Sequence, residues 1–356
     1  MKTLFIYCLF LAGSIRIASA VDPSVVCSGT EKSGHAEAAA ISRFEQAYTE
    51  MAAMLDGKNP LSIKRAVFLS EWAYYDEELS YDEYCRTIDS AAIFLKGLIL
   101  KNKLDQYKTG KNIALIAYFS NPFSGNNHRP FTYDFTNTND EDDITLQFVT
   151  RVMRTHKGQC RSLPMYYKIL AEAIGAEAYI TCAPAHTFIR YRNEDNLYPE
   201  EWVNVEIATR QITPEFWYKE HFEISDLAIR SKVYLHPLTD RETVAAQLSD
   251  LSIGYQTKFR RYDEFVLKCA EKSLEYLPYR YNTLIMKGKT IDTMLRSYLD
   301  SNGYALNDYV QYLDYQSKKT FADLKSLGWE AMSEELSKKL EEASRQAKII
   351  LTTNNQ

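Results

Sequence analysis

The sequence predicts an α+β protein in which helices dominate and a small antiparallel sheet lies near the middle of the chain. Apolar residues recur at helical spacing through residues 35–120 and again through the last third of the chain. Between these regions, residues 179–181, 187–191 and 202–207 form short runs rich in β-branched and aromatic residues, which are typical of strands. The 356 residues are enough for two or three domains.

Residues 1–20 have the pattern of a secretory signal peptide. Lys2 supplies the charge, an apolar run follows, and Ala18-Ser19-Ala20 is a small-residue cleavage site. We therefore expect an exported protein that is periplasmic, secreted or held at the cell surface. No stretch reaches the roughly 20 apolar residues of a membrane-spanning helix, so no transmembrane segment is predicted.

We divide the rest of the chain into three regions. They are an N-terminal helical region at 21–138, a central core at 139–238 and a C-terminal helical region at 239–350. Helical periodicity predicts helices over 35–55, 60–75, 81–98 and 112–119, and nothing in these segments points to chemistry. They are interpreted as a supporting bundle. A polar connection is predicted at 121–140. Because it leads towards Cys160, we expect it to form one wall of a site. A helix over 144–154 follows it.

Composition excludes several classes of function. The formal net charge is −5 and the charges are mixed, so binding to nucleic acid or to an anionic membrane is not expected. The six cysteines form no CxxC pair and no cluster with histidine at metal-ligand spacing, so neither a metal nor another cofactor is expected. Loss of Cys8 with the signal would leave an odd number of cysteines, and therefore at least one unpaired thiol.

Cys160 is the candidate nucleophile, because it lies where a loop turns into a predicted helix over 165–174 that ends at Gly175. A free thiol has a pKa of about 8.5 and is mostly protonated at neutral pH. The N–H groups at a helix N-terminus and a neighbouring imidazole favour the thiolate, and the same N–H groups can receive an oxyanion. Gln159 offers a further side-chain donor, and Arg161 offers a charge for the thiolate or for an acidic substrate.

His186 is the candidate base and Glu206 the candidate acid that orients it. His186 follows Cys160 after one helix and one strand, and Ala183-Pro184-Ala185 precedes it. Alternate residues of a strand share a face, so His186 and Arg190 share one face, and Asn204 and Glu206 share a face of the next strand. If Arg190 opposes residue 204 or 202, Glu206 lies beside or diagonal to His186, with Asn204 one step further away as a supporting residue.

These three segments resemble the motifs of the transglutaminase-like superfamily, over roughly residues 140–210. Its motifs are Gly-x-Cys-x-Ser at the start of a helix, an Ala-Pro-x-His-like segment opening a strand, and Trp-Val-x-Val-Asp. Here they read Gly158-Gln159-Cys160-Arg161-Ser162, Ala183-Pro184-Ala185-His186 and Trp202-Val203-Asn204-Val205-Glu206. The chain departs from the family in having glutamate where aspartate is usual.

The resemblance implies a small core that shares its layout with papain-like thiol enzymes. Cys160 would be the nucleophile, His186 the base and Glu206 the orienting acid. It further implies an acyl transfer at an amide bond of a peptide or protein substrate, with hydrolysis expected more than transfer to an amine. The superfamily also contains members that kept the fold and lost activity, so the alternative is an inactive core that binds a protein or peptide.

The C-terminal region resembles tetratricopeptide repeats. Ile253-Gly254 fits the Leu-Gly pair of a first helix, and residues 270–278 match a second helix with its closing proline. Gly288 lies at the matching position of a following unit, which is only partly present. Such repeats brace a fold by stacking or bind a protein partner, and both roles remain open here. A last amphipathic helix is predicted over 329–343.

Overall fold

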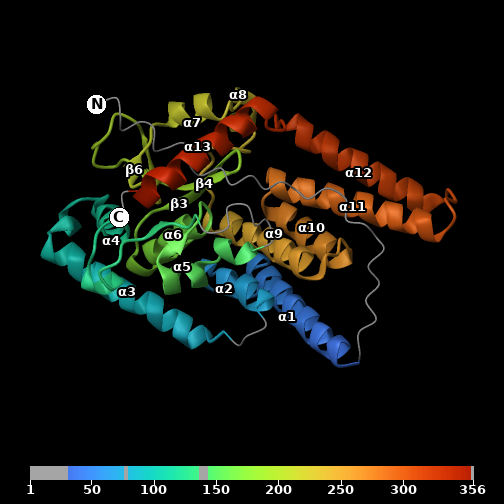
Figure 1. Ribbon diagram of the computed structural model, residues 1–356, viewed down its shortest axis with the longest axis horizontal. Coiled ribbons are helices and arrows are strands. Elements are labelled where there is room, and N and C mark those ends of the chain that lie inside the picture. The colour runs from blue at the N-terminus through green and yellow to red at the C-terminus, as the bar shows by residue number, and fades with distance from the viewer. Residues whose placement is uncertain (1–30, 76–78, 136–142, 354–356) are drawn as a thin grey trace. The chain divides into compact units, whose positions relative to one another are not determined.

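A computed structural model describes residues 31–75, 79–135 and 143–353 (Figure 1). The described part contains thirteen α-helices and a few short strands, which confirms the predicted α+β class with helices dominant. The predicted signal peptide lies outside the described residues, as do Cys8, Cys27 and residues 138–142. None of the helices in the described ranges is long and apolar enough to span a bilayer.

The chain forms two compact units, and each is built from segments far apart in sequence. Within the described ranges, one unit comprises residues 80–239 and 327–353, and the other comprises residues 31–79 and 240–326. This division cuts across the three consecutive regions expected from the sequence. The helices of residues 35–120 do not form one bundle, because the first two pack on a helix of residues 240–259 and the next two pack with the helix after Cys160.

The helical unit is formed by helices from two separate stretches of the chain, residues 31–79 and 240–326. They are α1 (Glu31–Leu55), α2 (Ile63–Tyr74), α9 (Asp240–Phe259), α10 (Glu264–Tyr276), α11 (Tyr281–Ser301) and α12 (Asp308–Ser326). Ser62 caps α2 by accepting the N–H of Arg65, and Asp263 caps α10 in the same way. Phe44 of α1 is fully buried, and its ring meets that of Tyr255 edge-on at 5.4 Å.

Consecutive helices α9 to α12 pack against one another, as stacked helical repeats would. A Cβ atom on Gly254 would lie 3.6 Å from the ring of Phe44, and one on Gly288 would lie 2.6 Å from the ring of Phe321. Both glycines therefore face an aromatic ring of a neighbouring helix. Their assignment to tetratricopeptide-like repeats stays a prediction.

The second unit combines helices with two small sheets. Its helices are α3 (Tyr81–Lys101), α4 (Gly110–Ser120), α5 (Val149–Thr155), α6 (Ser162–Ile174), α7 (Glu215–His221), α8 (Asp226–Arg230) and α13 (Glu334–Thr353). The strands are β1 (Thr132–Tyr133), β2 (Lys157–Gly158), β3 (Tyr179–Ala183), β4 (His186–Arg192), β5 (Trp202–Glu206) and β6 (Gln211–Ile212). Strands β1 and β2 pair in parallel, and β3-β4-β5-β6 form an antiparallel sheet in sequence order. Helix α6 packs against β3 and β4 (Figure 1).

The helix expected over 144–154 is interrupted. A short 3-10 helix, η4 (Ile144–Gln147), comes first, and α5 begins only at Val149. Phe148 between them has the extended dihedral angles φ −93° and ψ 136°. The carbonyl of Leu146, just before the break, accepts the hydroxyl of Ser162 of α6 at 3.1 Å.

Candidate active site

Cys160 lies in the turn that leads into α6. The carbonyl of Gln159 accepts the N–H of Leu163 at 3.1 Å, which starts the hydrogen-bond ladder of the helix. The hydroxyl of Ser162 accepts the N–H of Gln159 at 2.9 Å and fixes the turn from inside. Cys160 is 7% exposed. Cys160 therefore lies in a buried turn, two residues before the first residue of α6.

Gly158 lets α5 and α6 approach this turn closely. A Cβ atom at this position would lie 2.5 Å from Cγ2 of Val152 and 2.7 Å from Oγ of Ser162. The residue also pairs with Tyr133 of β1, and its carbonyl accepts the N–H of Asp134 at 2.8 Å. Cys160 therefore lies in the segment that directly follows β2.

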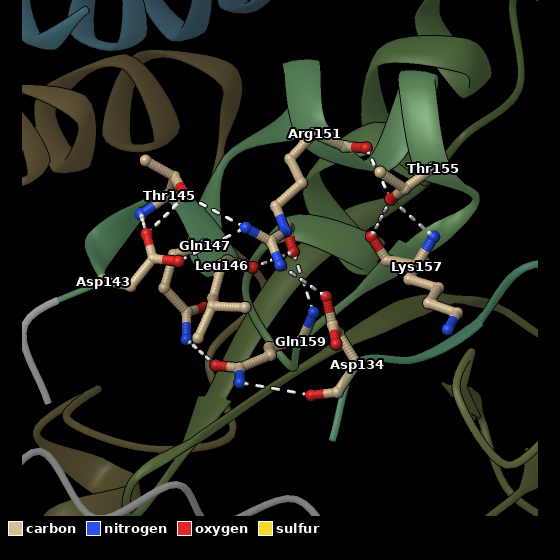
Figure 2. Close-up of polar contacts among 10 residues, drawn as sticks. Asp134, Asp143, Thr145, Leu146, Gln147, Arg151, Thr155, Lys157 and Gln159 are labelled. Carbon is tan, nitrogen blue, oxygen red and sulfur yellow. Dashed lines mark hydrogen bonds and ion pairs between the residues drawn. The ribbon is translucent and has the colours of Figure 1, made fainter. Parts of the chain in front are cut away.

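A polar network braces the approach to Cys160 (Figure 2). The guanidinium of Arg151 on α5 donates to Asp134 at 3.1 Å, to Asp143 at 3.3 Å and to Thr145 at 3.2 Å. Asp134 is buried, so its pairing with Arg151 compensates for the loss of water around the carboxylate. The network joins the segment after β1, η4 and α5 around the Cys160 turn.

Gln159 is part of this network. Its amide nitrogen donates to the carbonyl of Asp134 at 3.3 Å, and its amide oxygen accepts a hydrogen bond from Gln147 (Figure 2). Both ends of the side chain therefore help to hold the loop, and one N–H of the amide nitrogen is already donated to Asp134. Arg161 is the last residue before α6, is partly exposed, and accepts the N–H of Met165 through its carbonyl at 3.1 Å.

His186 is the first residue of β4 and follows a two-residue turn. Ala183 and His186 are paired across the β3–β4 hairpin, with Pro184 and Ala185 between them. Ala185 has a φ of 51°, an uncommon value for a residue other than glycine, as the tight reversal requires. Nε2 of His186 lies 2.8 Å from Oε1 of Glu206, and both side chains are buried.

The register of the sheet explains why Glu206 meets the ring from a diagonal position. Arg190 pairs with Asn204 and Ile189 with Val205. One further step would set Glu206 opposite Phe188, so its carboxylate reaches His186 across one diagonal of the sheet. The ring of His186 is nearly parallel to those of Phe188 and Phe222, with centroids 6.0 and 6.1 Å away.

The electrostatics of His186 follow from these neighbours. Burial alone would lower the pKa of His186, but the charge of Glu206 and the interaction with Cys160 raise it to about 10. Cys160 is therefore one of the groups that interact with His186. Because Nε2 is bonded to Glu206, Nδ1 is the nitrogen left for the thiol, and Nδ1 meets no partner within ordinary hydrogen-bond geometry.

Asn204 does not reach the histidine. Its amide oxygen accepts Nε of Arg190 at 2.7 Å, and its amide nitrogen donates to the carbonyl of Thr213 at 2.9 Å. Arg190 is itself buried and also donates to the carbonyl of Leu235 at 2.5 Å and to Glu215 at 2.6 Å. The supporting role expected for Asn204 is thus one of holding strands and loops together.

Two tyrosines at the site had no motif to mark them in the sequence. The hydroxyl of Tyr218 on α7 donates to Oε1 of Glu206 at 2.5 Å. Tyr133 of β1 is buried, and burial together with the neighbouring Cys160 raises its pKa well above the usual value. Both tyrosines reach the site through contacts between segments that are distant in the sequence. The sequence indicated only that the connection at 121–140 leads towards Cys160.

Comparisons of the chain with protein-family models, with curated proteins and with solved structures find no match. The site therefore has to be interpreted from its own geometry. In the described ranges, no group of three or more His, Cys, Asp or Glu side chains is arranged to hold a metal ion.

Proposed function

We propose that the protein is an exported thiol enzyme with a transglutaminase-like core, which acts on an amide bond of a peptide or protein. The single observation that carries the proposal is the buried contact of 2.8 Å between Nε2 of His186 and Oε1 of Glu206, with Cys160 beside the same ring. Three separate segments supply the nucleophile, the base and the orienting acid that the proposed thiol catalysis needs.

In the proposed reaction, the thiolate of Cys160 attacks the carbonyl carbon, and N–H groups at the start of α6 receive the oxyanion. The imidazolium of His186 gives its Nδ1 proton to the leaving amine as the C–N bond breaks, which leaves a thioester on the sulfur. His186 then takes a proton from water, a C–O bond forms and the C–S bond breaks. Glu206 keeps the Nε2–H oriented and stabilises the imidazolium throughout.

An amine in place of water would complete a transfer instead of a hydrolysis. The signal-like first twenty residues support action outside the cytoplasm, and the helices α9 to α12 are a proposed contact surface for a protein partner. The alternative function is an inactive core that only binds peptides or proteins.

Turnover of a broad peptide library separates the two functions. We expect the purified protein to cleave a subset of peptides, and a thioester on Cys160 to be detectable by mass spectrometry after rapid acid quenching. Cys160→Ala should abolish both signals. Cys182→Ala is the matched control, because Cys160 and Cys182 are each 7% exposed. Peptide binding without turnover, unchanged in Cys160→Ala, would instead support the binding module.

A further inference from the structure

We propose that Tyr218 is a fourth member of this site, a positioning residue whose hydroxyl locks Glu206 in the rotamer that serves His186. The inference rests on the proposed function for its catalytic meaning, but the lock itself is a property of the folded protein. It assigns a role to α7 that the three motif segments do not contain.

Two donors converge on one oxygen atom. Oε1 of Glu206 accepts from the hydroxyl of Tyr218 at 2.5 Å and lies 2.8 Å from Nε2 of His186. Tyr218 is 0% exposed, Glu206 2% and His186 5%. Water therefore has little access to compete for the carboxylate. A buried carboxylate is costly unless it is paired and hydrogen-bonded, and charge-assisted hydrogen bonds of this kind are among the strong ones.

The diagonal position of Glu206 explains why a second anchor is needed. A glutamate has one more rotatable bond than an aspartate, and here it reaches a histidine that is not directly opposite in the sheet. Free rotation of that longer side chain would move Oε1 away from Nε2. The Tyr218 hydroxyl fixes the carboxylate end. Glu206 held by Tyr218 can therefore orient His186 as a shorter aspartate would.

Tyr218 is itself held rigidly. Its ring stacks on Phe188 with centroids 4.2 Å apart and an interplanar angle of 10°. At the start of α7, the carboxylate of Glu215 accepts from Arg190 at 2.6 Å, and the N–H of Glu215 donates to Glu200 at 3.0 Å. The helix that carries Tyr218 is thereby tied to β4 and to the β4–β5 loop, and its hydroxyl has a fixed position.

The hydroxyl also acts on the charge of the site. The charge of Glu206 raises the pKa of His186, and the Tyr218 hydroxyl holds the oxygen that carries this charge at Nε2 of the ring. Loss of the hydroxyl should therefore make the imidazolium less stable and the thiolate less abundant at neutral pH. His221 also lies within electrostatic reach of His186, but burial, Lys339 and His186 lower its pKa to about 4, so it stays neutral over this range.

The test is Tyr218→Phe, which keeps the ring and removes the hydroxyl. We expect the rate of Cys160 alkylation by iodoacetamide at pH 7 to fall about 10-fold, in keeping with the loss of one hydrogen bond to a charged group. We also expect the acid limb of its pH profile to move to higher pH. Tyr167→Phe is the matched control, since Tyr167 is also 0% exposed and its hydroxyl bonds to Asn112 at 3.0 Å, away from Glu206.

A second measurement separates this inference from the proposed function. In a Cys160→Ala background, the titration of the His186 ring is followed by NMR, which needs no substrate. A shift of that titration to lower pH by Tyr218→Phe supports the lock even if no peptide is ever cleaved. If Tyr218→Phe matches Tyr167→Phe in both the alkylation profile and the titration, Tyr218 has no positioning role, whatever the enzyme does.

Discussion

At the scale of single residues, His186 is governed by a competition between burial and charge. Burial lowers its pKa, whereas Glu206 and Cys160 raise it, and the balance is a pKa of about 10. An unfolded histidine has a pKa of about 6.5, so the folded protein holds this proton more tightly than the unfolded chain does. The resulting stabilisation is complete below about pH 6.5 and is lost as the pH rises towards about 10.

Removal of the Glu206 charge tests this balance. In Glu206→Gln only burial and the weaker interaction with Cys160 remain, so we expect the pKa of His186 to fall and its ring to be neutral at pH 7. The measurement is the ¹⁵N chemical shift of the ring nitrogens against pH. Glu201→Gln, which removes an exposed partner of Arg192, should leave the titration unchanged. An imidazolium that persists at pH 8 in Glu206→Gln would contradict the assignment of Glu206.

Residue types and strand parity predicted part of the site and missed another part. The period of two places Glu206 and Asn204 on one face, and the observed register of Arg190 with Asn204 is one of the two that were considered. Strand parity does not show with which polar neighbour a side chain will form a hydrogen bond. Asn204 is hydrogen-bonded to Arg190. The hydroxyl of Tyr218 reaches Glu206 from a different element, and no local pattern encodes such a contact.

At the scale of elements, Arg190 joins the parts that surround the histidine. From β4 it bonds to β5 through Asn204, to the start of α7 through Glu215, and to the segment after α8 through the carbonyl of Leu235. A buried guanidinium is costly unless such partners satisfy it, and removing it would leave them unpaired in turn. Arg190 is therefore one of the side chains that hold α7, and with it Tyr218, in position.

Two arginines of the same strand provide a matched comparison. We expect Arg190→Gln to lower the free energy of unfolding by about 3 kcal/mol, as for the loss of one partner from a buried hydrogen-bonded charge network. Arg192→Gln should cost less than about 1 kcal/mol, because the pair of Arg192 with Glu201 is solvent-exposed. Urea denaturation measures both. Equal effects of the two substitutions would mean that Arg190 does not hold these elements together.

Elements with strong periodicity were predictable, whereas interruptions were not. The helices of residues 35–119 and the strands around His186 and Glu206 occur where apolar spacing and β-branched runs indicated them. The break at Phe148 was missed, because the apolar spacing of residues 144–154 continues across it. Next to the break, the Leu146 carbonyl accepts the hydroxyl of Ser162, a contact between segments that periodicity does not report.

At the scale of the whole molecule, the units are assembled from segments that are distant in the sequence. Helix α2 packs with α9, and α3 packs with α6, so a chain that looks like three consecutive regions forms two discontinuous units. Periodicity shows that a helix has an apolar face but not which distant helix will cover it. The fold class was therefore predictable from the sequence, whereas the partition of the helices required the structure.

The most direct test of the central claim compares the cysteines of the intact chain in one experiment. Iodoacetamide labelling is followed by mass spectrometry at each of the four described thiols between pH 5 and 9. Cys182 is as little exposed as Cys160, and Cys269 is fully buried with a pKa raised well above its usual value by that burial. Cys85 is partly exposed and reports ordinary access of the reagent.

We predict that Cys160 reacts at least about 10-fold faster than Cys182 at pH 7, because the imidazolium of His186 favours its thiolate. We also predict that His186→Ala removes this difference. A Cys160 that reacts no faster than Cys182, or whose rate is unchanged in His186→Ala, would contradict the account.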